Sequence, residues 1–185
     1  MRNRTRVVLA MAFGFAPFLI ARQETVAKPG PEMQRLLRAF EGTWDIRETY
    51  EPSEWAPSGG SGRGREVFRA GPGGSSMVED YRSTTPAGEL SGLSVTWWDG
   101  KANGYRAIWC DSRSPGGCTI MSKLAKWEGD RFVLGDELER DGKRIVLREV
   151  LSDITPTSFT QTLYQGEAGG EPKRMLTIRA TKSGK

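Results

Sequence analysis

Histidine is absent from all 185 residues of this chain. Its absence excludes the serine–histidine–aspartate triad, cysteine–histidine nucleophiles, histidine-ligated zinc and histidine-ligated haem. Carboxylates are then the remaining candidates for acid–base chemistry. The sequence predicts no cofactor, no metal site and no catalytic residue, and it favours a binding or structural protein over an enzyme.

Cysteine is scarce, since only Cys110 and Cys118 occur. A spacing of seven residues, with no histidine and no further cysteine, makes a poor metal site. Ser, Pro and Gly lie between them and separate two strand-like runs, which is typical of a hairpin loop. We predict a disulfide across this loop, with two free thiols as the alternative.

The chain also lacks a long apolar segment. A run without charge covers residues 7–20, which is fourteen residues, whereas a transmembrane helix needs roughly 17–25. Three arginines precede this run, and the small residues Ala21 and Ala27 follow it, an order typical of a secretory signal peptide. We predict cleavage after Ala21 or Ala27, export to the periplasm or the medium, and no stable membrane span in the mature form. A transmembrane anchor is the alternative.

A large excess of charge is missing once this leader is set aside. The whole chain carries a formal net charge of +4, and residues 1–27 contribute +3 of it, which leaves +1 for the rest. A nearly neutral domain offers no electrostatic attraction for nucleic acid or an anionic membrane. We therefore expect no nucleic-acid partner.

One helical pattern precedes the rest of the chain. Apolar residues at 33, 36, 37 and 40 recur at helical spacing, Pro31 suits a first turn, and Gly42 ends the pattern. No second helical pattern follows, which argues against a parallel α/β sheet. We predict a signal peptide over 1–27, a linker and short helix over 28–41, and a single domain over 42–185.

Ten strand-like runs fill this domain. They lie near 43–51, 63–70, 75–83, 89–98, 103–110, 118–127, 130–139, 143–152, 157–166 and 173–182. Turn residues such as Asp141-Gly142 separate them, and short loops imply antiparallel neighbours. We expect an all-β fold, an antiparallel up-and-down barrel of about ten strands after a short helix, because closure removes exposed edges. An open sandwich is the alternative.

The start of the first strand resembles a known family. Gly42-Thr43-Trp44 directly follows the helix and is similar to the G-x-W signature of lipocalins and other calycins. In that superfamily the tryptophan closes the base of the barrel, and an arginine of the last strand packs over its ring. The resemblance implies a calycin-like barrel in which Arg179 takes that role.

A second resemblance covers most of the mature chain. Gly92, Trp98-Asp99, Tyr105 and Trp109-Cys110-Asp111 follow one another in an order similar to the central pattern of the bacterial family called "domain of unknown function 1579". This chain has Trp98 where Tyr or Phe is usual, and its cysteine pair is an addition. The resemblance implies the fold and no reaction.

Aromatic residues are the main candidates for a ligand site. Trp97 lies on one strand, and Tyr105 and Trp109 share a face of the next, so together they would line an apolar interior if the barrel is hollow. Ordinary core packing is the alternative. Arg106 and Arg148 are alternative polar anchors for an acidic ligand. The favoured interpretation is that both side chains face the solvent.

Three functions remain open. The first is an exported barrel that binds a small apolar or amphipathic molecule, and the second is a structural or interaction domain with a filled core. The third is a histidine-free enzyme that uses carboxylates on a lipophilic substrate. Glu137 and Glu139 share a strand face and are geometrically suited to such a pair, but a solvated exterior is the favoured interpretation, which the neighbouring Asp136 and Arg140 support.

Overall fold

Helix α1 (Pro31–Phe40) begins the part of the chain that the computed structural model describes, residues 28–184. Pro31 occupies its first turn, and the helix ends where the Glu41 N–H donates to the Leu37 carbonyl at 2.8 Å. Its apolar residues Met33, Leu36, Leu37 and Phe40 are all buried. The predicted signal peptide lies outside the described residues.

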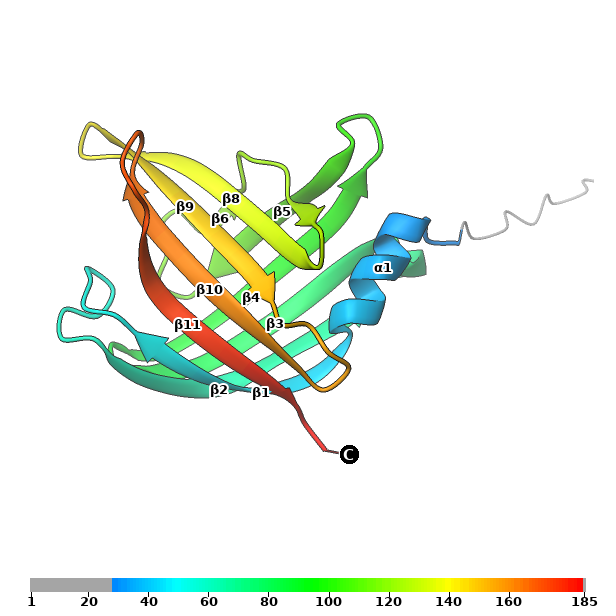
Figure 1. The fold of residues 1–185 in the computed structure, drawn as a ribbon, viewed down its shortest axis with the longest axis horizontal. Helices are drawn as coiled ribbons and strands as arrows, with labels where there is room; N and C mark the ends of the chain where they lie inside the picture. Colours follow the sequence, from blue (N-terminus) through cyan, green and yellow to red (C-terminus); the bar gives the residue numbers. More distant parts are fainter. Residues whose placement is uncertain (1–27, 185) are drawn as a thin grey trace, which may run out of the picture.

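Eleven strands follow the helix, and each is antiparallel to its neighbours (Figure 1). They are β1 (Gly42–Tyr50), β2 (Gly60–Ala70), β3 (Ser76–Thr85), β4 (Gly88–Asp99), β5 (Gly104–Asp111), β6 (Cys118–Ile120), β7 (Lys126–Glu128), β8 (Arg131–Arg140), β9 (Lys143–Ser152), β10 (Ser158–Glu167) and β11 (Lys173–Lys182), with a short 3₁₀ turn, η1 (Pro72–Gly74), before β3. Their order in the sheet is β6-β5-β4-β3-β2-β1-β11-β10-β9-β8-β7. The all-β antiparallel barrel with one short leading helix is therefore confirmed.

The predicted strand over 118–127 is two strands rather than one. β6 pairs with β5, whereas β7 pairs with β8. Between them the Met121 N–H donates to the Ala107 carbonyl of β5 at 2.9 Å, and the Ser122 N–H donates to Asp136 of β8 at 2.9 Å. Ala125 bonds back to Tyr105 of β5 through both its N–H and its carbonyl. Residues 118–128 therefore lie between β5 and β8, at the two ends of the curled sheet.

Trp44 closes the base of the barrel, as the resemblance implied. Its side chain is fully buried, its indole N–H donates to the Phe40 carbonyl at 2.7 Å, and its ring meets the Phe159 ring edge-on at 4.8 Å between centroids. Gly42 begins β1 with a φ of 134°, a conformation that favours glycine. Helix α1 covers this end of the barrel (Figure 1).

The expectation that Arg179 packs over Trp44 is wrong. Arg179 pairs with Arg47 and is exposed on the outer face. Lys182 lies directly opposite Trp44, and its ammonium stands 4.3 Å from the centre of the indole ring. The reason is strand alternation: Lys182 is in phase with the inward-facing Ala180, and Arg179 is not.

The disulfide prediction is confirmed, because Cys110 and Cys118 are bonded directly across β5 and β6. At the end of the barrel opposite α1, the hairpin ends of β8–β9 and β10–β11 lie near the loop that joins β1 to β2 (Figure 1). None of the helices within residues 28–184 has the length and apolar character needed to cross a bilayer.

Candidate functional site

Four glutamates face the interior of the barrel. Glu48, Glu66 and Glu79 come from β1, β2 and β3, and Glu149 comes from β9 on another part of the wall. Each lies in the inward phase of its strand, as its partners across the sheet show. The fold thus brings four acidic side chains from distant parts of the sequence into one enclosed space.

Glu48 is held by three hydroxyl groups. Tyr50 donates to it at 3.0 Å, Ser83 donates at 2.7 Å, and Tyr81 donates to its other oxygen. Burial, followed by the neighbouring Glu48 charge, raises the pKa of both tyrosines, so the two hydroxyls remain protonated donors. Gly62 leaves room for this carboxylate, because a Cβ there would lie 2.0 Å from Glu48 Oε2.

Glu66 has no such support. Its side chain is fully buried, and neither of its carboxyl oxygens has a hydrogen-bond partner. Burial raises the pKa of Glu66 well above its usual range, and the charges of Glu79, Glu149 and Glu48 raise it further. A buried carboxyl without a partner is costly, so it indicates that this region is adapted to something beyond stability.

Glu79 and Glu149 titrate near neutral pH. Burial, together with the Glu149 and Asp80 charges, raises the pKa of Glu79 to about 8. Burial raises the pKa of Glu149 to about 7, and a hydrogen bond from Gln161 Nε2 at 2.6 Å opposes the rise. Strongly perturbed carboxyls gathered in one enclosure are characteristic of functional sites.

Several inward-facing side chains beside these carboxyls keep accessible surface. Glu79, Trp109, Glu149 and Leu163 lie on the inner face, and each is only partly buried. A side chain that points into a barrel keeps accessible surface only where a water-sized space adjoins it. Water-sized space therefore adjoins each of these residues, beside apolar and acidic side chains, and we call this space the interior hollow.

The acidic groups have no basic partners inside. Within residues 28–184, none of the ion pairs involves Glu48, Glu66, Glu79 or Glu149. In that same stretch no three acidic side chains converge in a way that would hold a metal ion. The interior is thus an extended acidic surface rather than a metal-binding point.

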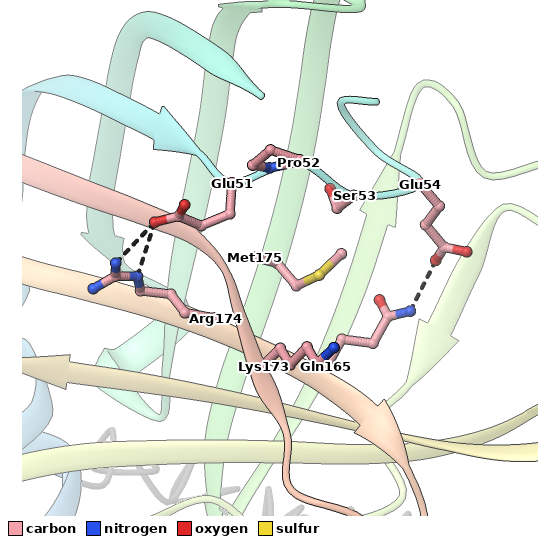
Figure 2. Close-up of a pocket in the computed structure, with 8 residues that line it drawn as sticks. All are labelled: Glu51, Pro52, Ser53, Glu54, Gln165, Lys173, Arg174 and Met175. Atoms are coloured by element: carbon pink, nitrogen blue, oxygen red, sulfur yellow. Dashed lines mark hydrogen bonds and ion pairs between the residues drawn. The ribbon is translucent and has the colours of Figure 1, made fainter. Parts of the chain in front are cut away.

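An open pocket of about 590 Å³ lies at the mouth of the barrel, between the β1–β2 loop and the β10–β11 hairpin (Figure 2). Arg174 donates to Glu51 at 2.8 Å on one side, and Gln165 donates to Glu54 at 2.9 Å on the other, with the Met175 thioether between them. Gln165 lies on the inner face of β10, opposite Leu147. The pocket therefore adjoins the end of the inner surface.

The loop itself crosses this mouth. Glu54 is bonded to Arg140 at the end of β8 as well as to Gln165. Ala56 is buried, and Trp55 packs against the core. The loop is thus held to the ends of β8 and β10 at the rim of the barrel, beside the open pocket.

The structure separates the three aromatic candidates. Trp97 pairs with Arg106 on the outer face, so the expectation that it lines the interior is wrong. Tyr105 faces inward but is packed at the closed base, where its hydroxyl donates to the Glu32 carbonyl at 2.9 Å. Trp109 faces the hollow, next to Tyr81 at 5.9 Å between ring centres. A one-residue phase difference between neighbouring strands decides these positions.

The alternative anchors lie outside the barrel. Arg106 forms an ion pair with Asp99 at 2.6 Å, and Arg148 is exposed and lies 3.5 Å from Glu128. Glu137 and Glu139 also lie on the outer face of β8, since the residues in the inward phase are Asp136 and Leu138. None of these four side chains belongs to the interior site.

Sequence reasoning missed most of the acidic cluster, although part of it was detectable. Glu48 occupies the same alternation as Trp44, Ile46 and Tyr50, all of which are buried. Glu66 is likewise in phase with the buried Phe68. An acidic residue in the apolar phase of a strand is the signal that points to these positions.

The fold and these inner carboxyls define the molecule as an antiparallel barrel with an acidic, partly hollow interior. Its fold is similar to that in the crystal structure of Rv2717c from M. tuberculosis, with a TM-score of 0.56, 14% identity, and coverage of 85% of this chain and 100% of that chain. A redesigned β-barrel, mFAP0, bound to DFHBI, has a TM-score of 0.42 and 14% identity, with 77% of this chain and 97% of that chain covered. At this identity the first likeness establishes the fold alone. No family model and no curated protein matches the chain.

Proposed function

We propose that this protein binds a small amphipathic molecule in the interior of its barrel. The observation that carries the proposal is the hollow beside Trp109 and Leu163, whose walls also include the carboxyls of Glu79 and Glu149. An apolar surface with a few convergent polar groups is the usual character of a small-molecule site. A filled structural core is disfavoured, because packed side chains would leave no accessible surface there.

A specific observation favours one second candidate. The pKa of Glu149 is raised to about 7 and that of Glu79 to about 8, which places both near the value that suits a general acid or base at neutral pH. A carboxylate-dependent enzyme that moves protons on a lipophilic substrate is therefore the alternative. Turnover of a bound molecule that stops in Glu149→Gln, while binding persists, would distinguish it.

A neutral lipophilic dye tests the binding proposal. N-phenyl-1-naphthylamine should bind the wild type saturably, and Trp109→Ala should weaken binding by about tenfold, because about 1.4 kcal/mol of apolar contact is lost. Trp97→Ala is the matched control, since it removes the same ring from the outer face of the same hairpin. Absence of dye binding by the folded wild type would refute the proposal, as would equal weakening by both variants.

Export is the second part of the proposal. The leading residues 1–27 have the order of a signal peptide. The disulfide between Cys110 and Cys118 supports this, because disulfides persist in oxidising compartments. Cell fractionation should place the protein outside the cytoplasm, with the leader removed after Ala21 or Ala27.

A further inference from the structure

An unpartnered indole N–H, that of Trp127, lies at the base of the barrel beside Phe40. The unpartnered polar atoms of the glutamates and glutamines on the inner face share one property. They are both carboxyl oxygens of Glu66, the amide oxygen of Gln161 and the amide oxygen of Gln165. All four are hydrogen-bond acceptors when Glu66 is ionised. The nearby hydroxyl donors of Tyr50 and Ser83 are already directed at Glu48.

The two glutamines leave their amide oxygens free because their amide nitrogens donate to glutamates. Gln161 donates its amide nitrogen to Glu149 at 2.6 Å, and Gln165 donates its amide nitrogen to Glu54 at 2.9 Å. Each amide oxygen is therefore the free end of its group. A complementary ligand must supply several donors and no acceptor.

We propose that the interior recognises the ammonium group of an organic amine, between Glu79 and Glu149 and within reach of the unpartnered acceptors. This inference rests on the proposed function, and it names the chemical class of the ligand. An ammonium group carries three N–H donors, no acceptor and a positive charge. Pairing it with a buried carboxylate offsets the cost of burying both charges.

Glu79 and Glu149 are the members of the cluster that contact the hollow, since both keep accessible surface on the inner face. Both lie in the inward phase of their strands, opposite Phe68 and Leu134, and the Glu149 charge raises the pKa of Glu79 and of Glu66. Glu66 is fully buried, both of its carboxyl oxygens lack a hydrogen-bond partner, and the charges of Glu79 and Glu149 raise its pKa. A single cation between them would reduce the mutual repulsion of all three.

A metal ion and an acidic ligand both fit less well. Within residues 28–184 no three acidic side chains meet at one point, as a metal ion would require. An acidic ligand would be repelled by the glutamates. The charge of Arg113 reaches Tyr50, but its guanidinium donates to the Thr85 hydroxyl at 3.2 Å and to the Glu89 carbonyl at 2.9 Å.

The rest of the ligand would be apolar. Trp109 and Leu163 adjoin the same hollow, and Leu147 lies on the inner face directly opposite Gln165 at the mouth. A hydrocarbon tail against these side chains would remove apolar area from water. An alkylamine is therefore the simplest probe of the site.

The test is calorimetric titration of the purified protein with octylamine, octanol and octanoate at pH 8, where an alkylammonium is still charged. Octylamine should bind at least about tenfold more tightly than octanol, and octanoate should bind most weakly. Glu149→Gln should weaken the binding of octylamine by about tenfold, because it removes the charge of the carboxylate. The affinity for octanol should stay within about twofold of the wild-type value. Glu139→Gln makes the same change on the exposed outer face, and it should leave the affinities for octylamine, octanol and octanoate unchanged.

The outcomes separate the two proposals. Equal affinities for octylamine and octanol, or equal weakening of both by Glu149→Gln, would overturn the amine inference and leave a neutral binding barrel in place. No binding of any of the three, together with no dye binding, would overturn both. Glu66→Gln provides a second variant of the cluster, and unchanged octanol binding reports that its fold is intact.

Discussion

Replacing Glu149 by glutamine removes one titrating group from the barrel interior without changing its size. Burial raises the pKa of Glu149 from 4.5 to about 7. Between these two values the folded protein keeps a proton that the unfolded chain has released. The free energy of unfolding falls with rising pH wherever the folded state binds more protons. The stability that protonated Glu149 provides is therefore fully present below pH 4.5 and is lost as the pH rises toward 7.

The size of this effect follows from the difference between the pKa of Glu149 in the unfolded and in the folded protein. A difference of about 2.5 pKa units between 4.5 and about 7 corresponds to about 3 kcal/mol. Because the carboxyl keeps some accessible surface in the hollow, we expect roughly 2–3 kcal/mol in practice. Loss of the charge also lowers the pKa of Glu79 and Glu66, which Glu149 raises, and this flattens the profile further.

The assay is urea unfolding, followed by tryptophan fluorescence at pH 5, 6, 7 and 8. The free energy of unfolding of the wild type should fall between pH 5 and pH 8. That of the Glu149→Gln variant should fall by roughly 2–3 kcal/mol less over the same range. Glu139→Gln should follow the wild type, because that side chain is exposed. Parallel profiles for the wild type and Glu149→Gln would show that Glu149 titrates alike in both states, and they would refute the reasoning.

Two further predictions concern stability. Trp44→Ala should lower the free energy of unfolding by roughly 3–5 kcal/mol, because it empties the fully buried base of the barrel; a loss below about 1 kcal/mol in urea unfolding would contradict the role given to this ring. Thiol titration of the unfolded, unreduced protein should find no reactive thiol at Cys110 or Cys118. Replacing both by serine should cost about 2–3 kcal/mol, and an unchanged unfolding midpoint would show that the closed loop adds no stability.

The elements that depend on local chemistry were predictable. The Asp141-Gly142 turn has positive φ at both residues, 51° and 74°, as a two-residue hairpin of this composition requires. The period of two placed strand β9 (Lys143–Ser152) at its observed bounds. The exception is the run over 118–127, which divides because its two halves bond to different neighbours. That exchange depends on strands far away in the sequence.

The site depended more heavily on tertiary structure. Alternation indicates which residues of one strand share a face, but it does not say which face is inner. For this reason the sequence predicts Trp97 on the inner face, whereas the register pairs it with Arg106 on the outer face. The role given to Arg179 failed for the same reason, since Lys182 is the residue in phase with Trp44.

By itself, the sequence determined the class of fold, the single leading helix, the disulfide between Cys110 and Cys118, and the exclusion of histidine chemistry. These features depend on composition, on local turn geometry and on short-range alternation, which one stretch of chain expresses alone. Only the tertiary structure decided that Glu66, Glu79 and Glu149 share one enclosure and that their pKa values rise there. The physical reason is that burial and mutual repulsion arise from side chains brought together across the barrel, over a separation of some eighty residues along the chain.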